Sequence, residues 1–149
     1  MNTSLLRLIF ILSCILGAIC GILSIMPYIG GLVFFALICL SSVVIMLFLI
    51  RSNFLRLESV PESITIGAII GFISYIAFSL VYMPLVLLLL KGFGYYANYG
   101  VALLLNNANL FILLVVTIFM AILSATGNAF TGFLLFYISE ILKNMNNKD

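Results

Sequence analysis

This chain of 149 residues contains no histidine and very few charged residues of either sign. Zinc, haem and copper sites draw most of their ligands from histidine and cysteine. The three cysteines form no Cys-x-x-Cys pair, and each lies in an apolar stretch where a thiol behaves as a small hydrophobic group. We therefore expect no metal and no other cofactor.

Acidic side chains are limited to Glu58, Glu62, Glu140 and Asp149, and none lies near the middle of an apolar stretch. Catalysis needs a nucleophile, a base or a metal within mutual reach. The sequence therefore predicts a protein that is not an enzyme. Proton-coupled transport is disfavoured for the same reason, because such carriers load the proton on a carboxylate or histidine inside the membrane.

What the chain does contain is apolar sequence. Hydrophobic residues make up 66% of it and charged residues 7%, against roughly 25% charged residues in soluble domains. A soluble fold of this size could not bury so much apolar surface, whereas a lipid bilayer removes the need to bury it. The net charge of +2 is too small to indicate nucleic-acid binding. We expect a single membrane domain over residues 1–149.

Four long apolar stretches cover residues 5–26, 32–50, 63–90 and 109–142. About 20 helical residues cross the ~30 Å hydrocarbon core, so the last two stretches must tilt or extend into the interface. The expected fold is all-α, a bundle of four transmembrane helices. Arg7, followed by an apolar run, resembles the start of a secretory leader. The apolar run continues past Cys20 without a polar cleavage region, which favours an uncleaved helix.

The basic residues indicate the orientation of these helices. Four crossings place both termini and the 51–62 connection on one side of the membrane. The basic residues on that side are Arg7, Arg51, Arg56, Lys143 and Lys148. The other side holds only Lys91. Because basic residues accumulate in cytoplasmic loops, we expect both termini in the cytoplasm, with the protein in a cell (inner) membrane or an organelle membrane.

A stripe of small residues occurs in the first span and recurs, at a spacing of fifty residues, in the third. Its members are Ser13, Gly17, Gly21 and Ser24, and then Ser63, Gly67, Gly71 and Ser74. Small residues four apart lie on one helix face and let helix backbones approach closely in lipid. The recurrence has two explanations, an internal duplication or repeated use of a good packing motif. The stripes lie at different depths relative to Pro27 and Pro84, which favours repeated packing.

The fourth span carries a polar cluster of Ser124, Thr126 and Asn128. An unpaired amide at mid-membrane is costly, so Asn128 must face protein or water. One interpretation is an interhelical hydrogen bond, and the other is a polar group that lines a solute site. Ser124, Asn128 and Gly132 share one stripe of the helix, and we favour the hydrogen bond.

The outer end of the predicted bundle has three further features. Pro84 removes a backbone donor and predicts a kink near the end of the third helix. Aromatic residues gather there as an interfacial belt, namely Tyr82, Phe93, Tyr95, Tyr96 and Tyr99. The apolar insert at 101–105 is expected to form a short interfacial helix.

These patterns predict a small non-enzymatic membrane protein. We expect it to be a structural, accessory or assembly subunit of a membrane complex, or a homo-oligomer, packed through its small-residue faces. Its partners would be the lipid bilayer and either another membrane protein or a second copy of itself. The alternative is a component of a small-solute channel or transporter, with Ser124, Thr126 and Asn128 along the path.

Overall fold

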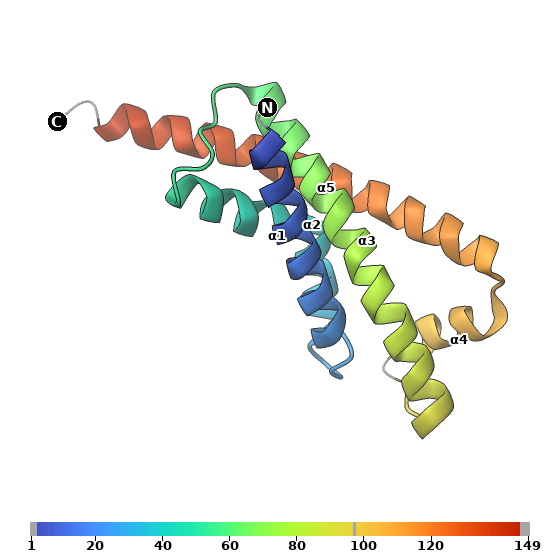
Figure 1. The fold of residues 1–149 in the computed structure, drawn as a ribbon. Coiled ribbons are helices and arrows are strands. Elements are labelled where there is room, and N and C mark those ends of the chain that lie inside the picture. The colour runs from blue at the N-terminus through green and yellow to red at the C-terminus, as the bar shows by residue number, and fades with distance from the viewer. Residues whose placement is uncertain (1–2, 97, 147–149) are drawn as a thin grey trace.

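The structure, a computed structural model, describes residues 3–96 and 98–146 of the chain. These residues form five helices and no strand (Figure 1). The helices are α1 (Thr3–Leu23), α2 (Gly30–Arg51), α3 (Val60–Phe93), α4 (Tyr99–Asn107) and α5 (Leu110–Asn146). Within the described residues, α1, α2, α3 and α5 are long and apolar enough to cross a membrane, which confirms the predicted all-helical class.

Several helix ends differ from the predicted ones. Helix α1 ends at Leu23, before the predicted residue 26, whereas local capping extends α3. Helix α3 begins three residues early, at Val60, because the Ser59 hydroxyl accepts a long 3.4 Å hydrogen bond from the Glu62 N–H. Pro61 stands in its first turn, where the missing N–H has no helical partner in any case. The helix ends at Phe93, and the following Gly94 has a φ of 62°, the left-handed conformation that glycine adopts most easily.

Helix α4 corresponds to the short helix expected over residues 101–105, and it is longer on both sides. The Asn98 side chain caps it by accepting a 3.2 Å hydrogen bond from the Val101 N–H. Helix α3 continues through Pro84 to Phe93 as one element. Helix α5 continues past the predicted end at residue 142 to Asn146.

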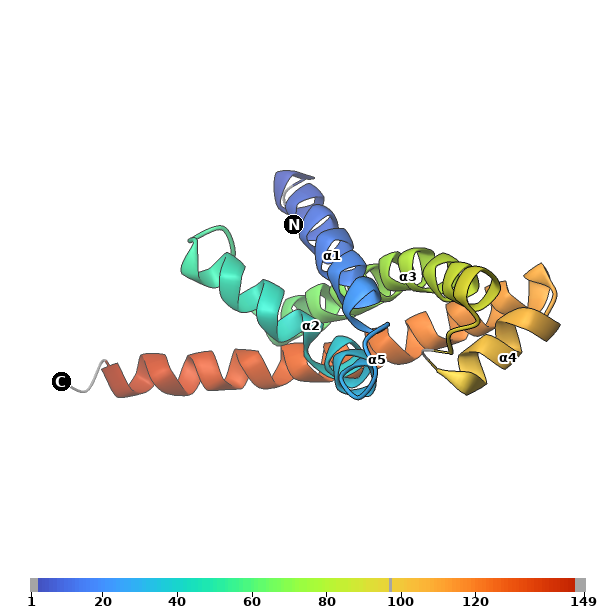
Figure 2. The same cartoon turned by 90° about the horizontal axis from the view of Figure 1, so that it is seen from below.

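Helix α3 is the centre of the molecule, because α1, α2 and α5 all pack against it. The long helices are splayed rather than parallel. Helix α5 crosses α3 and diverges from it toward both ends (Figure 1). Helix α4 packs against α3. Helix α2 changes direction midway along its length in both views (Figures 1 and 2). Of the four long helices, α5 is the least covered by the rest of the chain.

Two apolar clusters fill the spaces between the helices. The first joins α1, α2, α3 and α5 with the connection after α2, and its most buried members are Ile9, Met46, Leu49, Ile66 and Ile70. The second joins α2, α3, α4 and α5, and includes Leu37, Phe78, Val86, Ala102 and Ala121. Buried polar residues of α2 and α5, chiefly Ser41, Ser42 and Asn128, also lie between these helices.

Candidate functional site

The small-residue stripe of α1 lies against α3. Ser13, Gly17 and Gly21 are buried there, whereas Ser24 is buried just beyond the end of the helix. A methyl group added at Gly17 would overlap the backbone carbonyl oxygen of Ser74, so the two backbones are in direct contact. A side chain larger than hydrogen at Gly17 therefore requires α1 and α3 to separate.

The small-residue stripe of α3 faces α5. A methyl group at Gly71 would lie 2.5 Å from the carbonyl oxygen of Ser124. One at Gly132 of α5 would lie 2.6 Å from the carbonyl oxygen of Ser63. Gly67 sits equally close to the backbone of Asn128. Three members of the α3 stripe, Ser63, Gly67 and Gly71, therefore face α5. The backbone of the fourth member, Ser74, is in contact with Gly17 of the α1 stripe.

Serine hydroxyls add hydrogen bonds to the α3–α5 contact in both directions. The Ser63 hydroxyl donates to the carbonyl oxygen of Gly132 at 2.7 Å. The Ser124 hydroxyl donates to the carbonyl oxygen of Gly71 at 3.0 Å. These bonds form only because the adjacent glycines bring the two backbones within reach of a short side chain.

Asn128 lies at the junction of α5 with α2 and is fully buried. Its Oδ1 accepts hydrogen bonds from the Ser42 backbone N–H at 2.7 Å and from the Ser41 hydroxyl at 2.9 Å. Its Nδ2 donates to the carbonyl oxygen of Ile38 at 2.8 Å. In a regular α-helix the N–H of residue 42 bonds the carbonyl of residue 38. The amide therefore bridges the two members of one backbone pair of α2.

The remaining donor capacity of this amide is also used. Nδ2 lies 3.2 Å from the carbonyl oxygen of Leu37 and 3.0 Å from that of Ser124, one turn back on α5. A primary amide offers two N–H groups and one oxygen with two lone pairs. All of them have partners, so burial leaves no part of the Asn128 side chain uncompensated.

A smaller bond extends the α2–α5 junction toward the end of α5. The hydroxyls of Ser42 and Thr131 are 2.5 Å apart, and the Thr131 hydroxyl also lies 3.0 Å from the carbonyl oxygen of Asn128. Sequence reasoning missed Ser41 and Ser42, although two adjacent serines in a span otherwise rich in Leu, Ile and Phe are a signal. Gly127 completes the junction, because a methyl group there would lie 2.7 Å from the Ile38 carbonyl oxygen.

The three polar residues expected to act together in α5 do not share one surface. Ser124 and Asn128 are buried in helix contacts, but Thr126 is exposed and donates to the Ile122 carbonyl of its own helix at 3.0 Å. Positions two apart on a helix point in nearly opposite directions. The structure therefore brings two of the three together and separates the third.

Within residues 3–96 and 98–146, no three of the residue types histidine, cysteine, aspartate and glutamate lie close enough to hold a metal ion. The cysteines Cys14, Cys20 and Cys39 are free and partly buried in their helices. The arrangement that the chain builds around Asn128 is a saturated hydrogen-bond junction between helices. These hydrogen bonds can hold α2, α3 and α5 in one register.

Comparison with known proteins identifies no relative of this chain. No protein-family model matches the chain, and neither the curated proteins nor the solved structures include a significant match to it.

Proposed function

We propose that this chain is a non-enzymatic integral membrane protein that serves as a structural, accessory or assembly subunit of a membrane complex, or that forms a homo-oligomer. The observation that carries the proposal is that the rest of the chain covers little of α5. Its 37 residues extend over about 55 Å, yet α5 has the least coverage of the long helices and diverges from α3 toward both ends (Figure 1). Close packing against another protein would complete the contacts that its own chain leaves open.

The partner surface in this proposal differs from the small-residue stripes. Those stripes are used inside the chain, in the α1–α3 and α3–α5 contacts, and have no free face for a partner. The outer face of α5 instead carries large exposed side chains, among them Phe119 and Phe130. An aromatic row continues from it, with the rings of Phe133 and Tyr137 4.9 Å apart between centroids. We assign the partner contact to this face.

The proposed orientation places both termini in the cytoplasm, in a cell (inner) membrane or an organelle membrane. Three exposed arginines, Arg7, Arg51 and Arg56, belong to the end of the molecule that carries the N-terminus, the end of α2 and the start of α3 (Figure 1). Lys91 belongs to the opposite end. Lys148 and the side chain of Lys143 lie outside the described residues. The excess of positive charge at one end supports a cytoplasmic position for that end.

The alternative function, a small-solute channel or transporter component, has weaker support. It relied on Asn128, Ser124 and Thr126 as a polar lining. The amide of Asn128 is fully buried with its hydrogen-bonding groups occupied, and Thr126 faces away from it.

Site-specific photo-crosslinking in native membranes tests the subunit proposal. A photoreactive phenylalanine analogue replaces Phe119 or Phe130, one at a time. The matched control carries the same analogue at Leu80, which is 72% exposed on α3. We expect one discrete cross-linked protein from the α5 positions, identified by mass spectrometry as a membrane protein or a second copy of this chain. Lipid adducts alone from both α5 positions, with a monomeric mass in native-lipid nanodiscs, would contradict the proposal.

A further inference from the structure

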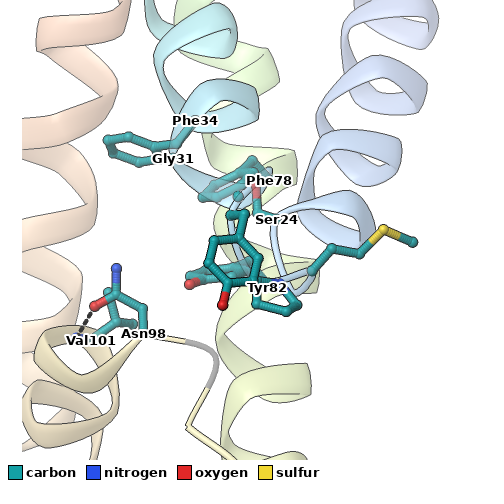
Figure 3. A pocket seen from close by; sticks show the side chains of 11 residues that line it. Ser24, Gly31, Phe34, Phe78, Tyr82, Asn98 and Val101 are labelled. Atoms are coloured by element: carbon teal, nitrogen blue, oxygen red, sulfur yellow. Dashed lines mark hydrogen bonds between the residues drawn. The ribbon is translucent and has the colours of Figure 1, made fainter.

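A cavity of about 190 Å³ lies where the connection between α1 and α2 meets α3 and the start of α4 (Figure 3). Six of the residues that line it are Ser24, Gly31, Phe34, Phe78, Tyr82 and Asn98. None of the lining residues is charged. The cavity is separate from the Asn128 junction and has no part in the proposed contact through α5.

Aromatic rings from two helices form one wall of the cavity. Phe34 of α2 and Phe78 of α3 have ring centroids 5.8 Å apart and tilted planes. Phe78 and Tyr82 are stacked, with centroids 5.0 Å apart and planes 21° from parallel. Phe78 and Tyr82 are both buried, which holds this wall in place. Ring faces arranged in this way accept another flat ring in offset or edge contact.

Three polar groups border the same space. Ser24 is 7% exposed, and its hydroxyl has no hydrogen-bond partner among the described residues and is itself buried behind the cavity surface. The Oδ1 of Asn98 is occupied by the Val101 N–H, and Figure 3 shows the amide nitrogen turned away from that bond. Tyr82 contributes a phenol. Each of the three side chains can donate a hydrogen bond, and a buried hydroxyl without a partner is unfavourable.

We propose that this cavity binds one neutral planar ring that carries a hydrogen-bond acceptor, such as the carbonyl oxygen of an aryl ketone or a quinone. The size fits, since a cavity of about 150 Å³ holds a benzene molecule, and the larger volume here leaves room for a small substituent. The aromatic wall receives the ring, and the donors of Tyr82 and Asn98 receive the acceptor. An ion would find no opposite charge, and a plain hydrocarbon would leave the donors unpaired.

Fluorine NMR of the full chain in lipid nanodiscs tests this binding, with 4′-fluoroacetophenone as the probe. We expect a saturable change in the probe resonance that empty nanodiscs do not produce. A matched probe without the acceptor, 4-fluoroethylbenzene, should bind about tenfold more weakly, which corresponds to the loss of one hydrogen bond. Equal behaviour of the two probes, or no difference from empty nanodiscs, would overturn the proposal.

Two variants connect the signal to the cavity. A methyl group added at Gly31 meets nothing within 4 Å, so Gly31→Leu can enter the cavity without touching neighbouring backbone, and it should abolish binding. The matched control is Gly92→Leu, another position with open space, which should bind as the native chain does. Asn98→Ala should weaken the ketone about tenfold and leave the hydrocarbon unchanged. Undiminished ketone binding by both Gly31→Leu and Asn98→Ala would place the probe elsewhere and refute the assignment.

The ring could reach the cavity from water or from the lipid phase, and competition separates the two sources. Unlabelled acetophenone represents a free ring, and a short-chain ubiquinone analogue represents a ring attached to a lipid tail. Stronger displacement by the quinone analogue identifies a lipid-borne ring as the ligand, and stronger displacement by acetophenone identifies a free one. Failure of both compounds to displace the probe would overturn the site.

Discussion

The side chain of Asn128 forms the hydrogen bonds that a backbone peptide group would form. Its side-chain amide has the same donor and acceptor as a backbone amide, and it bonds the N–H of Ser42 and the carbonyl of Ile38 together. Insertion of a side chain between such a pair is a recognised cause of helix bending. The insertion lies midway along α2, where this helix changes direction (Figures 1 and 2). The hydrogen bonds of Asn128 and the change of direction therefore coincide on α2.

Replacing Asn128 with alanine is expected to lower the free energy of unfolding by about 2 kcal/mol. Single interhelical hydrogen bonds in membranes contribute about 0.6 kcal/mol on average, and the loss here combines several of them. The cost is limited because a regular α-helix pairs the Ser42 N–H with the Ile38 carbonyl, so both groups have a partner without the amide. Unfolding by a denaturing detergent in mixed micelles measures this difference.

Thr126→Ala is the matched control for this substitution, because Thr126 is on the same helix, is exposed and bonds only its own helix. Its free energy of unfolding should stay within about 0.5 kcal/mol of the native value. An Asn128→Ala variant as stable as the Thr126 control would show that the junction contributes no net stability.

The helices of this molecule pack where small residues let their backbones come into direct contact. Helix α3 presents glycine and serine to α5, and it receives the α1 stripe along the face that begins at Ser74. The sequence identifies the small faces because their spacing of four is visible without coordinates. It does not identify which face meets which, because any small face is compatible with any other. That choice depends on the register of the helices and on the direction of α2.

Gly71→Ala tests the α3–α5 contact at the scale of an element. The added methyl group would meet the Ser124 carbonyl oxygen at 2.5 Å and the Asn128 side chain at 2.7 Å, so the helices must separate. We expect a loss of about 1–3 kcal/mol in the free energy of unfolding, the usual cost of overpacking. Disulfide formation between cysteines introduced across the interface would report the changed distance independently.

Gly92→Ala on the same helix serves as the control, since a methyl group there meets nothing within 4 Å. Alanine should leave stability unchanged or raise it by up to about 1 kcal/mol, because it has the higher helix propensity. A destabilisation of the Gly92 variant equal to that of Gly71→Ala would assign the effect to backbone flexibility rather than to helix contact.

At the scale of the whole molecule, the sequence predicts the number and order of the helices but does not predict how they are arranged in space. Four apolar runs with polar connections specify four long helices, and the insert at 101–105 specifies a short one. The splayed arrangement left no trace in the sequence, because lipid and protein interior are about equally apolar. A helix such as α5 is rich in Leu, Ile and Phe whether a side faces lipid or protein, so its pattern does not reveal where it crosses α3.

The orientation of the whole molecule gives the final prediction. In a chain freed of its three native cysteines, single cysteines replace Glu58 in the α2–α3 connection and Tyr96 between α3 and α4, both exposed positions. With the arginines retained in the cytoplasm, a membrane-impermeant maleimide added to intact cells should label Tyr96→Cys at once. Glu58→Cys should react only after permeabilisation. The cysteine-free chain supplies the background. Reversed labelling would invert the orientation, and simultaneous labelling of both positions would show that α3 does not cross the membrane, since the two sites flank that helix.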